Sequence, residues 1–247
     1  MDVMTITNEM IKSLRDKTGV GMMDCKRALE AVGGDMDAAI EHLRKKGAAV
    51  SVKRADRAAK EGMIVTRVSA SGKRGVIIEV NCETDFVGRS DDFAAFAHAV
   101  AEAVEKRHPA DADALLKTTI GGKAISDLYN DLSAKVGEKI ELRRFQVVDS
   151  PDGAVSAYTH LGSRIGVLVE LVGIAPDQAA TGAGRDVAMQ VAAMNPLVIN
   201  REEVDKTVIE RELDIYRTQT KNEGKAADIA EKLAEGRLDK FFQEVVL

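Results

Sequence analysis

Three short amphipathic segments open the chain. Apolar residues recur in each at helical spacing, so that each segment has one apolar face. Thr7 and Asp35 stand where helix N-caps belong, and a glycine follows each segment, the last being Gly47. The apolar positions are Met10, Ile11 and Leu14, then Cys25, Leu29 and Val32, then Ala39, Ile40 and Leu43. This pattern predicts a bundle of three helices, of which the third ends at Gly47.

From Gly62 the pattern changes to that of strands. GMIVTRVSA and KRGVIIEVN are rich in β-branched residues and are separated by a Ser-Gly turn signal, which predicts a β-hairpin. Three more strands are expected in KIELRRFQVVD, GAVSAYTHLG and RIGVLVELVGI, and helices in 91–106, 125–136 and 184–194. Strands that cluster, with helices after them, predict an α+β fold with antiparallel sheets.

The end of the chain is dense in charge. Two amphipathic segments, 202–224 and 225–242, meet at Asn222-Glu223-Gly224. Their apolar positions are Ile209, Leu213 and Tyr216 in the first, and Ile229 and Leu233 in the second. The pattern predicts an antiparallel helical hairpin, a charged arm that is suited to contact with another molecule.

Two stretches place large apolar residues where no core is expected. Met22 and Met23 are consecutive in TGVGMMD, and consecutive helical residues cannot both face one core. We therefore predict that at least one of the two is exposed. Either one fills the core while the other lies on the surface, or they offer an apolar contact to a partner. In NCETDFVGRS, Phe86 follows Asp85 in the connection between a strand and a helix, where partial exposure is expected. Contact with a partner is the functional interpretation of both stretches.

Charge argues against broad binding to nucleic acid. The net charge is -5, and only 4% of residues are aromatic, so both phosphate contacts and stacking platforms are scarce. One local patch stands out in RKKGAAVSVKRADRAAK, where a single acid, Asp56, accompanies seven basic residues. These are Arg44, Lys45, Lys46, Lys53, Arg54, Arg57 and Lys60. We interpret the segment as a solvated linker and helix end, with an RNA site as the alternative.

Enzyme motifs are missing from the sequence. No P-loop motif occurs, and the four histidines show no zinc-binding spacing, so neither a metal nor a cofactor is expected. Cys25 and Cys82 are far apart and are expected to be reduced and structural. A hydrolase built on Cys82 and a distant histidine, or a general base made of Asp85 with Glu83, is disfavoured because no partner group accompanies them.

No targeting or membrane signal is present. The N-terminus lacks an apolar region typical of a signal peptide, and no apolar run approaches the roughly 18 residues that a membrane span needs. The sequence therefore predicts a cytoplasmic protein with no membrane contact.

Four strings taken together indicate a family. TGVGMMDCKRAL, EVNCETDFV, YTHLGSRIGVLVEL and EGRLDKFFQEV, in this order and at these separations, resemble the bacterial and organellar elongation factor Ts. Proteins of that family are nucleotide exchange factors for elongation factor Tu. They bind its G domain, lower the affinity for GDP and perform no covalent chemistry.

The resemblance implies a domain plan. It consists of a UBA-like (ubiquitin-associated-like) three-helix domain at 1–50, a basic linker at 51–60, a core of two α+β subdomains at 61–140 and 141–200, and a coiled-coil hairpin at 201–241. Longer members of the family continue with a further module. Residues 242–247 are accordingly expected to begin a C-terminal segment that is absent here.

The resemblance also implies which residues contact elongation factor Tu. The Asp85-Phe86 pair is expected to enter the partner near its magnesium site, with Thr84 and Val87 beside it. The other implied contacts are Arg15, Met22, Met23 and Lys26 from the N-terminal domain and His160 from the second core subdomain.

Two alternatives stay open on the sequence alone. One is a binding adaptor that uses Met22 and Met23, and the other is an RNA-associated or ribosome-associated protein that uses the segment 44–60. Self-association, or contact with another protein through the hairpin, is also left open.

Overall fold

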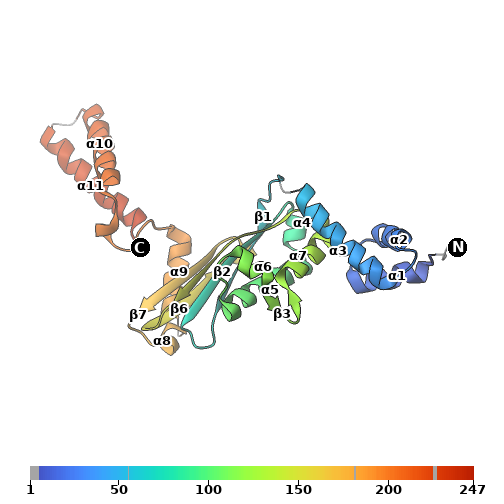
Figure 1. Ribbon diagram of the computed structural model, residues 1–247. Helices are drawn as coiled ribbons and strands as arrows, with labels where there is room; N and C mark the ends of the chain where they lie inside the picture. The colour runs from blue at the N-terminus through green and yellow to red at the C-terminus, as the bar shows by residue number, and fades with distance from the viewer. Residues whose placement is uncertain (1–5, 55, 181, 225–226) are drawn as a thin grey trace. The chain divides into compact units, whose positions relative to one another are not determined.

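A computed structural model describes residues 6–54, 56–180, 182–224 and 227–247. The described chain divides into two compact units, one up to Gly184 and one from Arg185 onward, and we describe each by itself. Figure 1 shows the elements of both units.

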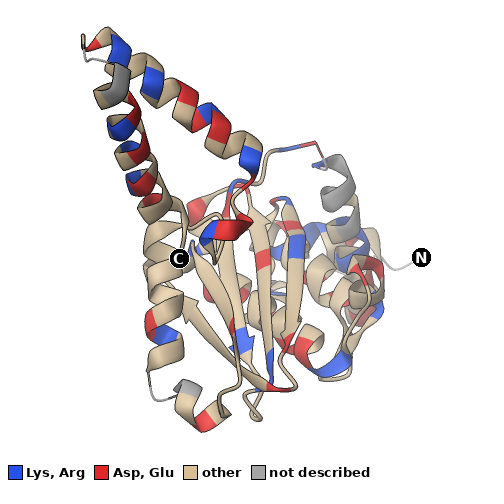
Figure 2. Cartoon of the chain, turned by 90° about the vertical axis from the view of Figure 1, so that its left-hand side faces the viewer, with Lys and Arg blue, Asp and Glu red and all other residues tan. Residues whose placement is uncertain are grey.

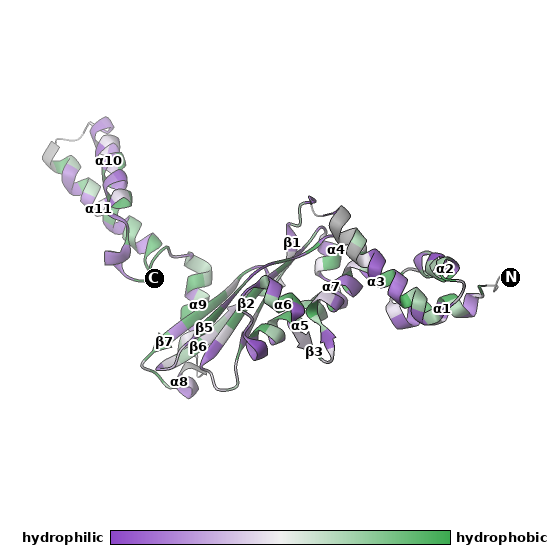
Figure 3. Ribbon diagram, viewed as in Figure 1, coloured by the Kyte–Doolittle hydropathy of each residue, from purple (hydrophilic) through white to green (hydrophobic). Residues whose placement is uncertain are grey.

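The first unit begins with the three predicted helices, α1 (Asn8–Thr18), α2 (Met22–Ala31) and α3 (Met36–Lys53). The Thr7 hydroxyl accepts a hydrogen bond from the Met10 amide at 3.2 Å, which confirms the predicted N-cap. Leu14 and Leu29 are fully buried between the helices. Figure 3 shows hydrophobic and hydrophilic residues interspersed along these helices, as amphipathic helices require.

The prediction that the third helix ends at Gly47 is wrong. Helix α3 continues to Lys53 and packs along α7 (Ile125–Val136). A Cβ atom on Gly47 would stand 2.2 Å from the Asn130 carbonyl oxygen and 2.9 Å from the Ala134 side chain. Gly47 therefore lets two helices approach closely and does not terminate one of them.

The predicted hairpin forms two strands of an antiparallel sheet in the order β1-β2-β5. Strand β2 (Arg74–Cys82) is central and pairs with β1 (Glu61–Val68) and β5 (Ile140–Asp149). A second pair, β6 (Gly153–Thr159) and β7 (Gly166–Val172), is also antiparallel, as is the short pair β3 (Thr119–Ile120) and β4 (Lys123–Ala124). The α+β fold with antiparallel sheets is confirmed.

The two faces of the central sheet are covered differently. Alternate residues of β2, among them Val76 and Ile78, are buried in a cluster with Phe93 of helix α5 (Asp91–Arg107). On the other face lies the β6–β7 pair, where a Cβ atom on Gly166 would stand 3.1 Å from the Ile77 side chain. Helices α5 and α7 thus cover one side of the sheet and two strands cover the other (Figure 1).

Short elements connect these layers. They are α4 (Asp85–Gly88), α6 (Ala112–Lys117), the 3-10 turn η1 (Leu161–Ser163) and α8 (Pro176–Ala180). Helix α9 (Ala183–Met194) begins where the first unit ends. Strand β5 pairs with β2 although the resemblance assigns residues from 141 onward to another subdomain, and the predicted domain boundaries stay predictions.

The second unit contains the predicted helical hairpin. A 3-10 turn, η2 (Arg201–Glu203), precedes α10 (Lys206–Asn222), which packs against α11 (Ala227–Val245). Charged residues of both signs line the two helices in Figure 2, and Arg237 joins them through an ion pair with Glu223 at 2.8 Å. Helix α11 runs past residue 241, where the hairpin was expected to end.

Within the parts of the chain that the structure describes, no helix combines the length and the apolar character needed to cross a bilayer.

The role of Gly47 can be tested by substitution. We expect Gly47→Ala to lower the free energy of unfolding by about 1–3 kcal/mol, because the added methyl group meets backbone atoms of α7. Gly236→Ala in α11 is the matched control, since a Cβ there meets nothing within 4 Å and should raise stability by about 0.5–1 kcal/mol. Urea unfolding followed by circular dichroism measures both. Equal stability of the two variants would contradict close packing at Gly47.

Candidate partner-binding site at the end of strand β2

Phe86 projects from the protein instead of packing into it. Its side chain is 85% exposed, whereas Phe93 is fully buried on the next helix. All six phenylalanines lie in described parts of the chain, and Phe86 alone among them is exposed. An exposed aromatic ring at a strand-to-helix connection is a natural contact for a partner protein.

The backbone that carries Phe86 is held by its neighbours. Helix α4 is a single turn, and the Thr84 hydroxyl accepts from the Val87 amide at 3.5 Å to cap it. The Cys82 thiol donates to the Thr84 carbonyl at 3.1 Å. Gly88 lets the turn approach β1, since a Cβ on it would lie 3.4 Å from the Gly62 amide. Phe86 is therefore exposed on a backbone that is fixed on several sides.

Two carboxylates anchor the same segment. Glu138, just after α7, accepts from the Thr84 amide at 3.0 Å and from the Thr84 hydroxyl at 2.6 Å. Glu83 accepts from the Lys139 amide at 2.7 Å and from Arg54 at 2.8 and 2.9 Å. The segments 83–84 and 138–139 are therefore joined across the end of the sheet, because each contributes one carboxylate that accepts hydrogen bonds from the other segment.

The acids near Phe86 are suited to structure and binding. Burial alone would raise the pKa of Glu83, but the Lys139 amide and Arg54 outweigh it and hold that pKa below its usual value. Asp85 forms an ion pair with Arg89 at 3.2 Å. Glu83 is thus an ionised acceptor that is already engaged, which removes the general-base interpretation.

Cys82 is equally unsuited to nucleophilic chemistry. Burial, reinforced by the negative charge of Glu138 and Glu61, raises the pKa of its thiol to about 12. Cys25 is also buried, and burial raises the pKa of its thiol as well. Both cysteines are free and buried, as expected for reduced residues in the core.

The N-terminal candidate residues all lie on the surface of α1 and α2. Met22 is 47% exposed and Met23 is 63% exposed, so the predicted exposure is confirmed, and the alternative that one of them fills the core does not hold. Both precede the buried face of α2, which Cys25, Ala28 and Leu29 occupy. Arg15 and Lys26 are exposed as well, and Lys26 lies 3.8 Å from Glu30.

His160 lies in the turn between β6 and β7. Its Nδ1 atom is 2.8 Å from the Tyr158 hydroxyl, and their ring centroids are 5.9 Å apart. The next residue, Leu161, is 90% exposed, and sequence reasoning missed it. The signal was available, because a large apolar residue before Gly162 in a turn has no core to fill, as for Phe86.

The structure brings the His160 turn and the Phe86 turn to the same strand end. Both α4 and η1 contact β1, and Arg164 after η1 pairs with Glu61 at the start of β1. Two exposed apolar residues, Phe86 and Leu161, therefore flank the beginning of that strand.

The basic segment is largely neutralised within the protein. Arg44 pairs with Asp127 and with Asp131, and Lys46 pairs with Asp24 at 2.5 Å. Arg54 and Arg57 both face Glu83, and Lys45 pairs with Glu41. Phosphate groups would have to compete with these carboxylates, which favours the helix end over the RNA site; the ion pairs were not part of the expected solvated linker.

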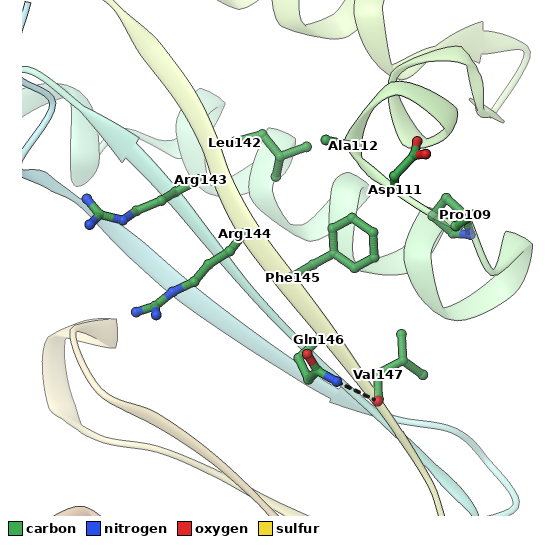
Figure 4. Close-up of a pocket in the computed structure, with 10 residues that line it drawn as sticks. Pro109, Asp111, Ala112, Leu142, Arg143, Arg144, Phe145, Gln146 and Val147 are labelled. Carbon is green, nitrogen blue, oxygen red and sulfur yellow. Dashed lines mark hydrogen bonds between the residues drawn. The ribbon is translucent and has the colours of Figure 1, made fainter.

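A hollow of about 680 Å³ is lined mostly by residues of α3, α5 and α7, and among its charged residues Arg44 forms ion pairs with Asp127 and Asp131. A cavity of about 460 Å³ lies between β5 and the start of α6, with Leu142 and Phe145 facing Ala112 in Figure 4. Arg143 and Arg144 extend away from Asp111 there, and both pair with Glu79. Among the described residues, no cluster of three or more potential metal ligands occurs. The exposed Phe86 and Leu161 therefore define a candidate surface for contact with another protein.

Comparison with known proteins identifies the family. A family model described as "Elongation factor TS" matches residues 83–247. Elongation factor Ts from Prosthecochloris aestuarii is 47% identical over 98% of this chain and 85% of the relative, and that from Chlorobium phaeovibrioides has the same identity and coverage. The chain belongs to the elongation factor Ts family.

Family membership decides between the functions left open by the sequence. The protein is a nucleotide exchange factor for elongation factor Tu, which is its partner, and it is not an enzyme with covalent chemistry. As a translation factor of this family it works in the cytoplasm, as expected from the sequence. The adaptor and RNA-binding alternatives are not supported.

The environment of Cys82 can be tested by thiol labelling. At about pH 8 a pKa of about 12 leaves a thiolate fraction roughly a thousandfold below that of a free cysteine. We expect iodoacetamide to leave Cys82 unmodified in the native protein and to label it after denaturation, with peptide mass spectrometry as the readout. Labelling of native Cys82 as fast as in the denatured protein would contradict the buried, neutral thiol.

Proposed function

We propose that the protein releases GDP from elongation factor Tu by inserting Phe86, with Asp85 beside it, among partner side chains near the magnesium site. The observation that carries this proposal is an 85% exposed phenylalanine on an anchored turn. The inserted ring displaces those side chains and weakens the contacts of the ion and the phosphates. GTP then reloads the vacant partner.

The energetics of insertion are adequate for this role. Full burial of a phenylalanine side chain contributes about 1.5–3 kcal/mol. A ligand that binds the distorted partner better than the GDP form must weaken GDP binding by the same factor, because the two binding equilibria are linked. Burial of Phe86 thus offsets the distortion that loosens the nucleotide.

The remaining contacts supply affinity. We propose that Thr84 and Val87 border the inserted ring, and that Arg15, Met22, Met23 and Lys26 bind the G domain. His160 makes a contact from the turn that flanks the same end of β1. The exposure of Met22, Met23 and His160 supports these assignments.

The helical hairpin is a second candidate contact surface, for another copy of the chain or for another protein. Ile215 of α10 and Ile229 and Leu233 of α11 are exposed there. Light scattering of the protein with and without elongation factor Tu measures the masses. A free protein of one-chain mass would contradict self-association.

The wedge is tested by Phe86→Ala in an assay of fluorescent GDP release from elongation factor Tu. With catalytic amounts of the protein, we expect the maximal release rate to fall about tenfold to a hundredfold, the equivalent of the lost burial. Val172→Ala is the matched control, because Val172 is 71% exposed at the end of β7 and outside the proposed contact. If Phe86→Ala releases GDP like the wild type, the wedge is refuted.

The methionines should affect affinity more than rate. We expect Met23→Ala to raise the half-saturating concentration in the same assay about fivefold, since truncation removes an apolar contact without touching the wedge. Its maximal rate should stay near that of the wild type. An unchanged half-saturating concentration would contradict the proposed contact of Met23 with elongation factor Tu.

A further inference from the structure

We infer that Glu138 is a positioning residue for exchange, whose carboxylate holds the turn that presents Phe86. This inference rests on the proposed role of Phe86. Glu138 is half-buried and lies 54 residues from Thr84, and it accepts two hydrogen bonds from that one residue. We call these two hydrogen bonds the Glu138 tether.

The turn needs such a tether because it has little stability of its own. Helix α4 contains four residues, and a single helical turn fixes several backbone dihedrals for very few hydrogen bonds. Phe86 adds no packing within the protein, since its ring is in water. The position of the ring is therefore set by its neighbours in the turn, which are Val87, packed against the core, and Thr84, where the turn begins.

The tether fixes both the backbone and the side chain of Thr84. One carboxylate oxygen holds its amide and the other holds its hydroxyl, which is the group that caps α4 through Val87. Hydrogen bonds to an ionised carboxylate are the strong kind, so this one group orients the cap. Without the Glu138 carboxylate, the Thr84 hydroxyl loses the hydrogen bond that orients it toward the Val87 amide.

Glu138 is itself placed by rigid structure. It follows Gly137, the left-handed C-cap of α7, and precedes Ile140, the first residue of β5, which is buried. The adjacent Lys139 amide donates to Glu83 at 2.7 Å, so that the segments 83–84 and 138–139 hold each other. The tether thus transmits the position of α7 and β5 to Phe86.

The test compares Glu138→Ala with Glu138→Gln in GDP release from elongation factor Tu. In Glu138→Ala we expect the maximal release rate to fall about tenfold, because the wedge is misplaced, and the half-saturating concentration to change less than about threefold. Glu138→Gln should recover most of the rate, since a carboxamide still accepts from the Thr84 amide and donates to its hydroxyl. Glu141→Ala is the matched control, an acid on β5 whose ion pair is with Lys139.

Double substitution separates tethering from a direct contact between Glu138 and the partner. If Glu138 acts through Thr84, then Thr84→Val combined with Glu138→Ala is no worse than Glu138→Ala alone. A contact that depends on the charge of Glu138 would instead make Glu138→Gln as slow as Glu138→Ala, which would overturn the inference.

Amide hydrogen exchange of the free protein tests the tether without the partner. We expect faster exchange in Glu138→Ala at Thr84 and at Gly88 and Arg89, whose amides bond back to Thr84 and Asp85. Glu138→Gln should show a smaller increase, because its carboxamide keeps hydrogen bonds to Thr84. Exchange in Glu138→Ala equal to wild type would overturn the tether, whereas a normal release rate in Phe86→Ala would overturn only the wedge.

Discussion

An aromatic ring that is 85% exposed gains no hydrophobic stabilisation from the core, so its position has to come from the contacts of its neighbours: Val87, which packs against the core, and the polar groups of the backbone. In this protein those contacts gather where β2 ends. Glu138 holds Thr84, Glu83 holds the Lys139 amide, and Cys82 donates to the Thr84 carbonyl. Several hydrogen bonds thus fix the end of the central strand, and Phe86 follows it after a few residues.

The same region connects the three-helix domain to the core. Helix α3 lies along α7 because Gly47 has no side chain, and Arg54 beyond the end of α3 reaches Glu83. Arg44 adds ion pairs to Asp127 and Asp131 of α7. The basic segment therefore has a structural role, because its charged side chains pair with carboxylates of the same chain.

Local signals in the sequence predicted much of this fold. Caps at Thr7 and Asp35, the period of the strands and the charge of the hairpin all reflect interactions between near neighbours, and the structure contains them. The predicted end of the third helix at Gly47 was wrong, because a glycine that ends a helix and one that lets a second helix approach look alike in sequence. The sequence did not show that both Met22 and Met23 are exposed, because that follows from the buried face of α2, which begins only at Cys25.

The site was predictable only in part for the same reason. Phe86 could be singled out because an aromatic residue stood in a connection, and the family resemblance gave it a role. Glu138 could not, because its link to Thr84 joins positions 54 residues apart that only the packed sheet brings together. Leu161 carried the same local signal as Phe86 and was overlooked beside His160.

The central claim is that the ring of Phe86, in water in the free protein, becomes buried in elongation factor Tu. Hydroxyl-radical footprinting with mass spectrometry measures the oxidation of Phe86 directly, in the free protein and in its complex with nucleotide-free elongation factor Tu. The account predicts ready oxidation in the free protein and strong protection in the complex, while the exposed Val172 is oxidised equally in both. Equal oxidation of Phe86 in the free and bound states would contradict it.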